Sequence, residues 1–329
     1  MTPVAERART QLLGRRDQLA GLAMRRRDHR LVALLQKVDS ALAALEVGEW
    51  GICAVCREPM SAERLHDDPL VTVCLECLEP AERRSLERDL EAAARVQRAL
   101  LPERELRHDG WEMAYLWEPH GAVSGDHVDV VRPADDSEPL HLLLGDVMGK
   151  GLAASLLQAH LHALFRALAG PAGSLGELLG RANRLFCEAT AGTRYASMVA
   201  ARLHADGRVE LANAGHPRPL LADSRGVRPV EGAGMPLGLF AAAAYEAREL
   251  WLPPGSTLLL YTDGWTEALR GDEELGIGRA AIALQRGEGL PLTEVLAVCR
   301  GELERFLGGG PRADDLTLLA LRRSRATVS

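Results

Sequence analysis

The chain has 329 residues, a formal net charge of −7, and 47% hydrophobic and 26% charged residues. This length exceeds what one hydrophobic core usually organises, so we expect at least two folding units. The composition is typical of a globular protein and excludes an intrinsically disordered one, and the acidic balance gives no overall attraction to nucleic acid or anionic membranes.

The N-terminal segment predicts helix, because residues 4–47 contain no proline and leucine recurs at helical spacing. An apolar seam steps alternately by four and three residues, through Leu31, Leu35, Val38, Leu42 and Leu45. This spacing favours a short coiled coil or a helical hairpin. A basic cluster, Arg25, Arg26, Arg27 and Arg30, is interpreted as a solvated helix face or hairpin tip, with a partner-binding surface as the alternative. Nucleic-acid binding through this cluster and the cysteine-rich segment that follows is a weaker possibility.

Two pairs of cysteines follow, Cys53–Cys56 and Cys74–Cys77, each a Cys-x-x-Cys motif, with 17 residues between the pairs. No signal peptide or membrane-spanning stretch is recognisable, so we expect a cytoplasmic protein, in which clustered cysteines indicate metal rather than disulfides. A tight turn within each pair can direct both sulfurs to one tetrahedral ion. We predict one structural Zn²⁺ bound by all four thiolates.

Residues 39–78 resemble the zinc finger of the DksA/TraR family. The resemblance rests on residues 41–46 (ALAALE), on Trp50-Gly-Ile-Cys53, on Cys56-Arg-Glu-Pro59 and on the second cysteine pair. Members of that family insert an acidic helix tip into RNA polymerase, whereas the helices here carry basic residues. We therefore predict a sensory, docking or dimerising module.

The linker and the C-terminal half contain helices and strands without a regular βαβ alternation, which favours an α+β layered fold. Expected helices are 81–101, 152–168, 175–189 and 292–307. Expected strands are 140–147, 195–203, 208–213, 257–262 and 316–321, the second and third joined as a hairpin at 205–207.

Four segments of this half place aspartate beside glycine or a second aspartate. They contain Asp126 with Asp129, Asp146, Asp263, and Asp314 with Asp315. Carboxylates suit hard cations such as Mg²⁺ and Mn²⁺, and glycine lets the backbone turn sharply at strand ends. Asp-Gly is also a common turn signal, so no segment is decisive alone. Taken together they predict a metal site assembled from distant parts of the chain.

The same region resembles the SpoIIE/RsbU branch of the type 2C metal-dependent protein phosphatases over about 220 residues. The matching motifs are Ala94 to Pro102, Gly125-Asp-x-x-Asp129, Gly145-Asp-Val-Met-Gly-Lys-Gly151, Asn213-Ala-Gly-His-Pro217, Met235-Pro-Leu-Gly238, Leu260-Tyr-Thr-Asp-Gly264 with Glu267-Ala268, and Asp314-Asp-Leu-Thr317.

This resemblance implies an α-β-β-α sandwich with two Mn²⁺ or Mg²⁺ ions at one end of two antiparallel sheets. Asp146 would bridge the ions, and the carbonyl of Val147 would be a further ligand. Asp126, Asp263 and Asp314 would complete the set, with Asp129 and Asp315 in supporting hydrogen-bonding roles. For His216 the preferred interpretation is a histidine that stabilises its turn, with general acid as the alternative.

The resemblance further implies a serine/threonine phosphatase whose substrate is a STAS-type anti-anti-sigma protein in a partner-switching pathway. We predict five segments: a helical coiled-coil segment (1–50), the zinc finger (51–79), a linker helix (80–102), the phosphatase domain (103–322) and a tail (323–329). A homodimer through the N-terminal and linker helices is expected. The alternative function is a transcription regulator whose finger contacts RNA polymerase, with the phosphatase domain as a scaffold.

Overall fold

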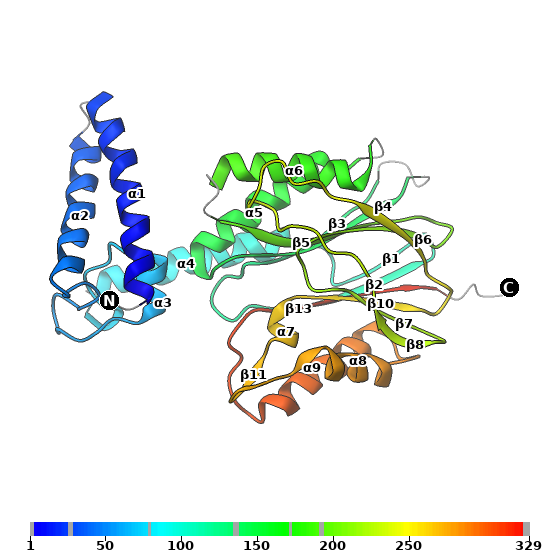
Figure 1. Cartoon of the computed structure of the whole chain (residues 1–329). Helices are drawn as coiled ribbons and strands as arrows, with labels where there is room; N and C mark the ends of the chain where they lie inside the picture. Colours follow the sequence, from blue (N-terminus) through cyan, green and yellow to red (C-terminus); the bar gives the residue numbers. More distant parts are fainter. Residues whose placement is uncertain are drawn as a thin grey trace. The chain divides into compact units, whose positions relative to one another are not determined.

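The structure is a computed structural model that describes residues 3–25, 29–77, 80–133, 138–170, 173–190 and 194–324. The chain forms two compact units, Met1–Asp89 and Leu90–Ser329 (Figure 1). Of the predicted basic cluster, Arg26 and Arg27 lie outside the described residues. Among the helices that are described, none is both long and apolar enough to cross a membrane.

The first unit begins with two long helices, α1 (Pro3–Arg25) and α2 (His29–Glu46), which pack against each other as a helical hairpin (Figure 1). Leu12 and Leu19 of α1 and Val38 and Leu45 of α2 are buried in their shared core. Val38 and Leu45 belong to the seam identified in the sequence. Of the two arrangements that the leucine spacing predicts, the described residues form the hairpin.

Short elements complete the first unit. These are α3 (Ala62–Asp67), a 3-10 turn (Leu75–Cys77) and the start of α4 (Pro80–Leu100), whose last residues belong to the second unit. Ser61 caps α3 by accepting a hydrogen bond from the backbone of Arg64. Cys53, Met60 and Leu65 form a small core, and Cys74 and Cys77 of the second pair pack against it.

The second unit is built on two antiparallel sheets. The six-stranded sheet has the order β1 (Glu105–His108), β2 (Trp111–Glu118), β13 (Leu316–Arg323), β10 (Thr257–Tyr261), β7 (Leu220–Asp223), β8 (Gly226–Pro229). The five-stranded sheet has the order β3 (Asp126–Val131), β4 (Leu140–Val147), β5 (Ala196–Leu203), β6 (Arg208–Ala214), β9 (Ala247–Trp251). The small hairpin of β11 (Leu269–Arg270) and β12 (Glu273–Glu274) stands apart from both sheets.

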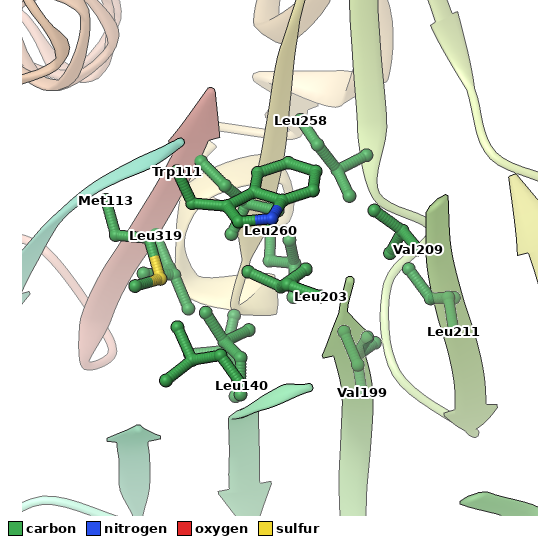
Figure 2. Packing of buried hydrophobic residues seen from close by; sticks show 14 of the residues in the cluster. Trp111, Met113, Leu140, Val199, Leu203, Val209, Leu211, Leu258, Leu260 and Leu319 are labelled. Carbon is green, nitrogen blue, oxygen red and sulfur yellow. The ribbon is translucent and has the colours of Figure 1, made fainter. Parts of the chain in front are cut away.

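The inner faces of the two sheets share one apolar core (Figure 2). Strand β4 shows why: Leu142 and Leu144 belong to this core, whereas Leu143 between them faces the helices on the other side. Alternate residues of a strand point to opposite faces, and both faces of β4 are buried, so leucines occupy its central positions on both sides, with His141 and Asp146 as the charged or polar exceptions. Trp111 of β2 is fully buried in the same core.

Helices cover both outer faces, which completes an α-β-β-α sandwich (Figure 1). On the five-stranded sheet lie α5 (Gly151–Leu168) and α6 (Leu175–Thr190), whose Phe165 and Phe186 are buried in the core shared with the sheet. On the six-stranded sheet lie α7 (Asp263–Thr266), α8 (Gly276–Arg286) and α9 (Leu292–Leu307). The predicted fold class is thereby confirmed.

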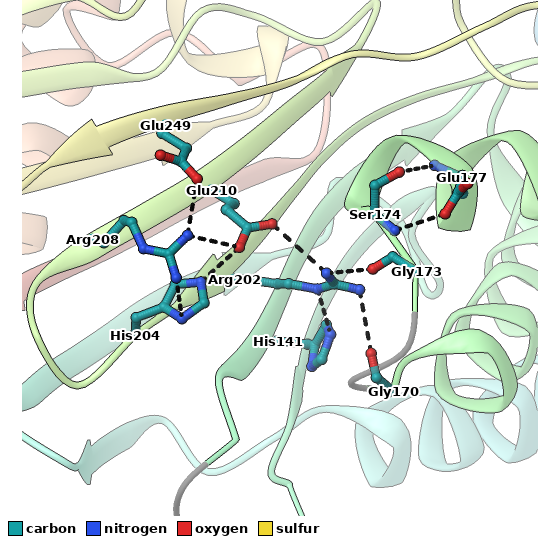
Figure 3. Close-up of polar contacts among 10 residues, drawn as sticks. All are labelled: His141, Gly170, Gly173, Ser174, Glu177, Arg202, His204, Arg208, Glu210 and Glu249. Carbon is teal, nitrogen blue, oxygen red and sulfur yellow. Dashed lines mark hydrogen bonds and ion pairs between the residues drawn. The ribbon is translucent and has the colours of Figure 1, made fainter.

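A buried polar network ties the connection between α5 and α6 to the five-stranded sheet (Figure 3). Arg202 of β5 is 5% exposed and donates hydrogen bonds to the carbonyls of Gly170 and Gly173 and to Nε2 of His141. Ser174 and Glu177 then start α6 by accepting each other's backbone N–H, a capping box.

Candidate functional site

Three of the four predicted catalytic aspartates line one cleft of about 700 Å³. Asp146 lies near the end of β4, Asp263 is the first residue of α7 directly after β10, and Asp314 lies in the segment before β13. Val147 lines the same cleft. Three segments that lie far apart in the sequence thus meet at one end of the two sheets.

The fourth, Asp126, lies behind the cleft wall and is 2% exposed. It begins β3 and stands opposite Asp146 in the register of β3 with β4. Its Oδ2 accepts hydrogen bonds from Thr262 Oγ1 at 2.9 Å and from Thr317 Oγ1. Both threonines belong to the motifs that carry Asp263 and Asp314, so Asp126 connects three of the four aspartate segments.

The carboxylates repel one another in the absence of a counter-cation. Burial, and then the charges of Asp263 and Asp314, raise the pKa of Asp146 to about 7. Burial is also the main cause of the raised pKa of Asp126 and of Asp263. Burial and mutual repulsion disfavour the ionised form of these carboxylates, and a divalent cation bound to their oxygens would stabilise that form. The residues present therefore fit a site for Mg²⁺ or Mn²⁺.

Two glycines allow the segments to approach so closely. A Cβ on Gly125 would lie 2.8 Å from the carbonyl oxygen of Val147 and 3.1 Å from Oδ1 of Asp146. A Cβ on Gly264 would lie 2.0 Å from the carbonyl oxygen of Asp315. A side chain at either position would push the carboxylate segments apart, which explains the Gly-Asp and Asp-Gly pairings in physical terms.

Asp129 is held away from the cleft by an ion pair. Arg166 donates to both of its carboxylate oxygens, at 2.8 and 2.9 Å, and His162 Nδ1 lies 3.1 Å from Oδ2. Asp129 is fully buried, and its pKa lies below the usual range despite burial because these partners stabilise the charge. Its role is to join α5 to β3.

Asp315 is likewise occupied by hydrogen bonds. Its two carboxylate oxygens accept the backbone N–H of His120 at 2.6 Å and of Gly125 at 2.9 Å. The supporting roles expected for Asp129 and Asp315 agree with these contacts.

His216 lines the cleft, but its hydrogen bonds stabilise its own turn. Asn213 accepts from the backbone N–H of His216 and donates to its carbonyl, and Ser197 Oγ lies 2.7 Å from Nδ1. Burial lowers the pKa of His216 to about 3, so the imidazole is neutral near pH 7. These contacts favour the structural interpretation over a general acid.

Several residues of the cleft were not predicted from the sequence. Lys150 Nζ lies 3.5 Å from Asp314 Oδ2, and Glu267, Glu274 and Arg218 complete a mixed charged wall. Lys150 stands inside the Gly-Asp-Val-Met-Gly-Lys-Gly motif, so a signal was present. Glu267, which belongs to one of the matching motifs, caps the end of α7, and Glu274 lies in β12; no site role was predicted for either from the sequence.

In the first unit the four cysteines gather into a second candidate metal centre. One sulfur from each of Cys53, Cys56, Cys74 and Cys77 lies within 4.8 Å of all the others. The sulfurs of Cys56 and Cys74 are 3.7 Å apart, which is too long for a disulfide but close to the spacing of two sulfurs that lie about 2.3 Å from one tetrahedral Zn²⁺. Cys53 Sγ also accepts the backbone N–H of Val55 and of Cys74. This donor set fits zinc.

Comparison with solved structures identifies the class of fold. The SiaA-PP2C domain of Pseudomonas aeruginosa superimposes with a TM-score of 0.64 at 23% identity, over 74% of this chain and 98% of that domain. A structure of RsbU and RsbW domains from Mycobacterium tuberculosis gives a TM-score of 0.57 at 27% identity, over 65% of this chain and 60% of that one. The second unit therefore has the PP2C phosphatase fold.

Sequence comparison is more specific. Residues 136–324 match the profile of the Stage II sporulation protein E (SpoIIE) family, and the chain belongs to that family. It is 24% identical over 266 residues to Protein IcfG of Synechocystis and 27% identical over 183 residues to the phosphoserine phosphatase RsbP of Bacillus subtilis. The alignment with Protein IcfG covers 72% of this chain and 42% of that relative, and the alignment with RsbP covers 54% of this chain and 45% of that relative. This chain therefore spans less than half the length of either relative.

Proposed function

We propose that this chain is a metal-dependent protein phosphatase that hydrolyses phosphoserine or phosphothreonine. The observation that carries the proposal is the cleft into which Asp146, Asp263 and Asp314 project from three separate segments. RsbP and RsbU, two relatives of this chain, are named phosphoserine phosphatases, which supports the same reaction here.

The chain's own residues would hold two Mn²⁺ or Mg²⁺ ions. Asp146, Asp263, Asp314 and the carbonyl of Val147 would bind from the cleft wall, and Asp126 from behind Asp146. Bound divalent ions supply Lewis-acid activation of water and neutralise charge on the phosphoryl group. Thr262 and Thr317 keep Asp126 in place through its Oδ2, and Asp315 fixes Gly125 next to it.

The substrate we propose is a phosphorylated STAS-type anti-anti-sigma protein in a partner-switching pathway, as the SpoIIE/RsbU resemblance implies. The first unit would serve as a regulatory module in which Cys53, Cys56, Cys74 and Cys77 bind one Zn²⁺. We further propose a cytoplasmic protein that forms a homodimer through its N-terminal and linker helices, with the five segments assigned from the sequence.

The test is metal-dependent hydrolysis of para-nitrophenyl phosphate and of a phosphorylated STAS protein by the full chain. We expect turnover that requires added Mn²⁺ and that falls by more than about a hundredfold in Asp146→Asn and in Asp263→Asn. Asp272→Asn is the matched control, because Asp272 is exposed in the β11–β12 turn. Undiminished activity in both cleft variants would contradict the proposed site, and a lack of turnover in the wild type with Mn²⁺ would contradict the proposed reaction.

A further inference from the structure

Two glutamines are buried beside Asp126, although neither lines the cleft. Gln97 of α4 is 4% exposed and Gln158 of α5 is 1% exposed. A buried amide that is not fully hydrogen-bonded is costly, so the partners of these side chains define what they hold in place.

Gln97 binds the backbone of Ser124, two residues before Asp126. Its Oε1 accepts the N–H of Ser124 at 3.0 Å, and its Nε2 donates to the carbonyl of the same residue at 2.6 Å. The side-chain amide thus replaces the two hydrogen bonds that a neighbouring strand would provide. Ser124 in turn accepts the N–H of Asp126 with its Oγ at 3.0 Å.

Gln158 binds the residue that follows Asp126. Its Nε2 lies 2.6 Å from Nδ1 of His127, and its Oε1 accepts the second hydrogen of Gln97 Nε2 at 3.1 Å. The residues on either side of Asp126 are therefore held by two glutamines that also bind each other, Ser124 through its backbone and His127 through its imidazole.

The direction of every hydrogen bond in this chain of contacts is fixed. The Ser124 N–H can only donate, and its carbonyl can only accept, which sets the orientation of the Gln97 amide. Gln97 then donates to Gln158 Oε1, so Gln158 presents its NH₂ group to His127. Nδ1 of His127 must accept, and the imidazole carries its proton on Nε2.

We propose that Gln97 and Gln158 are positioning residues that set the place of Asp126 and, through it, the affinity of the metal site. The inference rests on the proposed function. Asp126 pairs with Asp146 across β3 and β4, so a displacement of the Ser124–His127 segment is transmitted to the cleft. Partners that orient metal ligands from outside typically change metal affinity 10- to 100-fold when removed.

The experiment compares Mn²⁺ binding by isothermal titration calorimetry in the full chain and in Gln97→Leu, Gln158→Leu and Gln97→Glu. The Gln97→Glu variant keeps the shape of the side chain, and in its ionised form the carboxylate would still accept from Ser124 but could not donate to the Ser124 carbonyl or to Gln158. Arg98→Leu, an exposed neighbour on the same helix, is the matched control. We expect the Mn²⁺ dissociation constant to rise about tenfold to a hundredfold in the three glutamine variants and to stay unchanged in the control.

A second measurement does not depend on metal or turnover. Long-range ¹H–¹⁵N spectra of histidine-labelled protein should show His127 as the Nε2–H tautomer, and the ¹⁵N shift of its Nδ1 should change in Gln158→Leu because the hydrogen bond to Nδ1 is lost. Unchanged Mn²⁺ affinity in cooperatively folded Gln97→Leu and Gln158→Leu, or an Nδ1–H tautomer in the wild type, would overturn the inference. A wild-type protein that binds Mn²⁺ but has no phosphatase activity would overturn only the proposed function. The Mn²⁺ affinities of the variants and the tautomer of His127 would still test whether Gln97 and Gln158 position Asp126.

Discussion

Replacement of Arg202 by methionine should destabilise the second unit strongly, because this side chain is the centre of the polar network between β5 and the α5–α6 connection (Figure 3). The variant Arg202→Met keeps most of the aliphatic volume but removes the hydrogen bonds to Gly170, Gly173 and His141. It also leaves Glu210, whose Oε2 lies 3.7 Å from the guanidinium, without its buried partner.

The magnitude follows from burial. Removing one partner of a buried ion pair costs about 3–5 kcal/mol. Glu210 keeps a hydrogen bond of 2.7 Å with His204 and an ion pair of 3.4 Å with Arg208, so we expect the lower end, about 3 kcal/mol of unfolding free energy. Arg208→Met is the matched control, since Arg208 is 36% exposed and such ion pairs contribute only about 0.2–1 kcal/mol.

The assay is urea unfolding of the full chain followed by tryptophan fluorescence, with hydrogen exchange of the β5 and β6 amides as a local measure. If Arg202→Met and Arg208→Met differ by less than about 0.5 kcal/mol, the network does not stabilise the fold as a buried unit and the reasoning is wrong.

Three further perturbations separate packing, protonation and metal binding. Gly264→Ala should lower the free energy of unfolding in urea by more than about 2 kcal/mol, because the new Cβ meets the Asp315 carbonyl oxygen. Gly301→Ala, which has open space around it within α9, should raise the free energy of unfolding by about 1 kcal/mol. Equal effects of the two variants would contradict this packing argument. Burial lowers the pKa of His141 from 6.5 to about 4, so the unfolded chain takes up this proton first and stability falls with acidification between these values. As the pH is lowered, the free energy of unfolding of the wild type should therefore fall more steeply than that of His141→Asn, by up to about 1.4 kcal/mol per pH unit. Parallel plots of unfolding free energy against pH would show that the pKa of His141 is not lowered in the folded protein. Mass spectrometry should find one zinc per chain, lost in Cys56→Ser with Cys74→Ser, and zinc retained in that variant would place the ion elsewhere.

The local patterns of the sequence determine much of this protein. The predicted strand 140–147 matches β4 in full, and the predicted helix 292–307 matches α9 in full. The first is a mainly apolar run and the second has apolar residues at helical spacing, and glycine or proline flanks each, so both the periodicity and the flanking residues predict the element. The cysteine pairs likewise predict their own cluster, because ligands within each pair are close in sequence.

Elements with weak local signals were missed. Strand β2 (Trp111–Glu118) mixes aromatic, small and charged residues, and helix α8 (Gly276–Arg286) begins directly after the short β11–β12 hairpin, without a side-chain cap. Strand β2 is fixed by its pairing with β13 from the far end of the chain, a contact that no local pattern encodes.

The sequence alone predicts the residue types of the candidate site, because short carboxylates beside glycines indicate a metal site with oxygen ligands. Which aspartate faces the cleft was decided only by the tertiary structure. Asp126 and Asp146 stand in similar motifs, yet Asp146 lines the cleft and Asp126 is buried behind it against Thr262 and Thr317. Asp129 is neutralised by Arg166 of α5. The physical reason is that exposure, charge partners and pKa depend on which segments pack together, and those segments lie far apart along the chain.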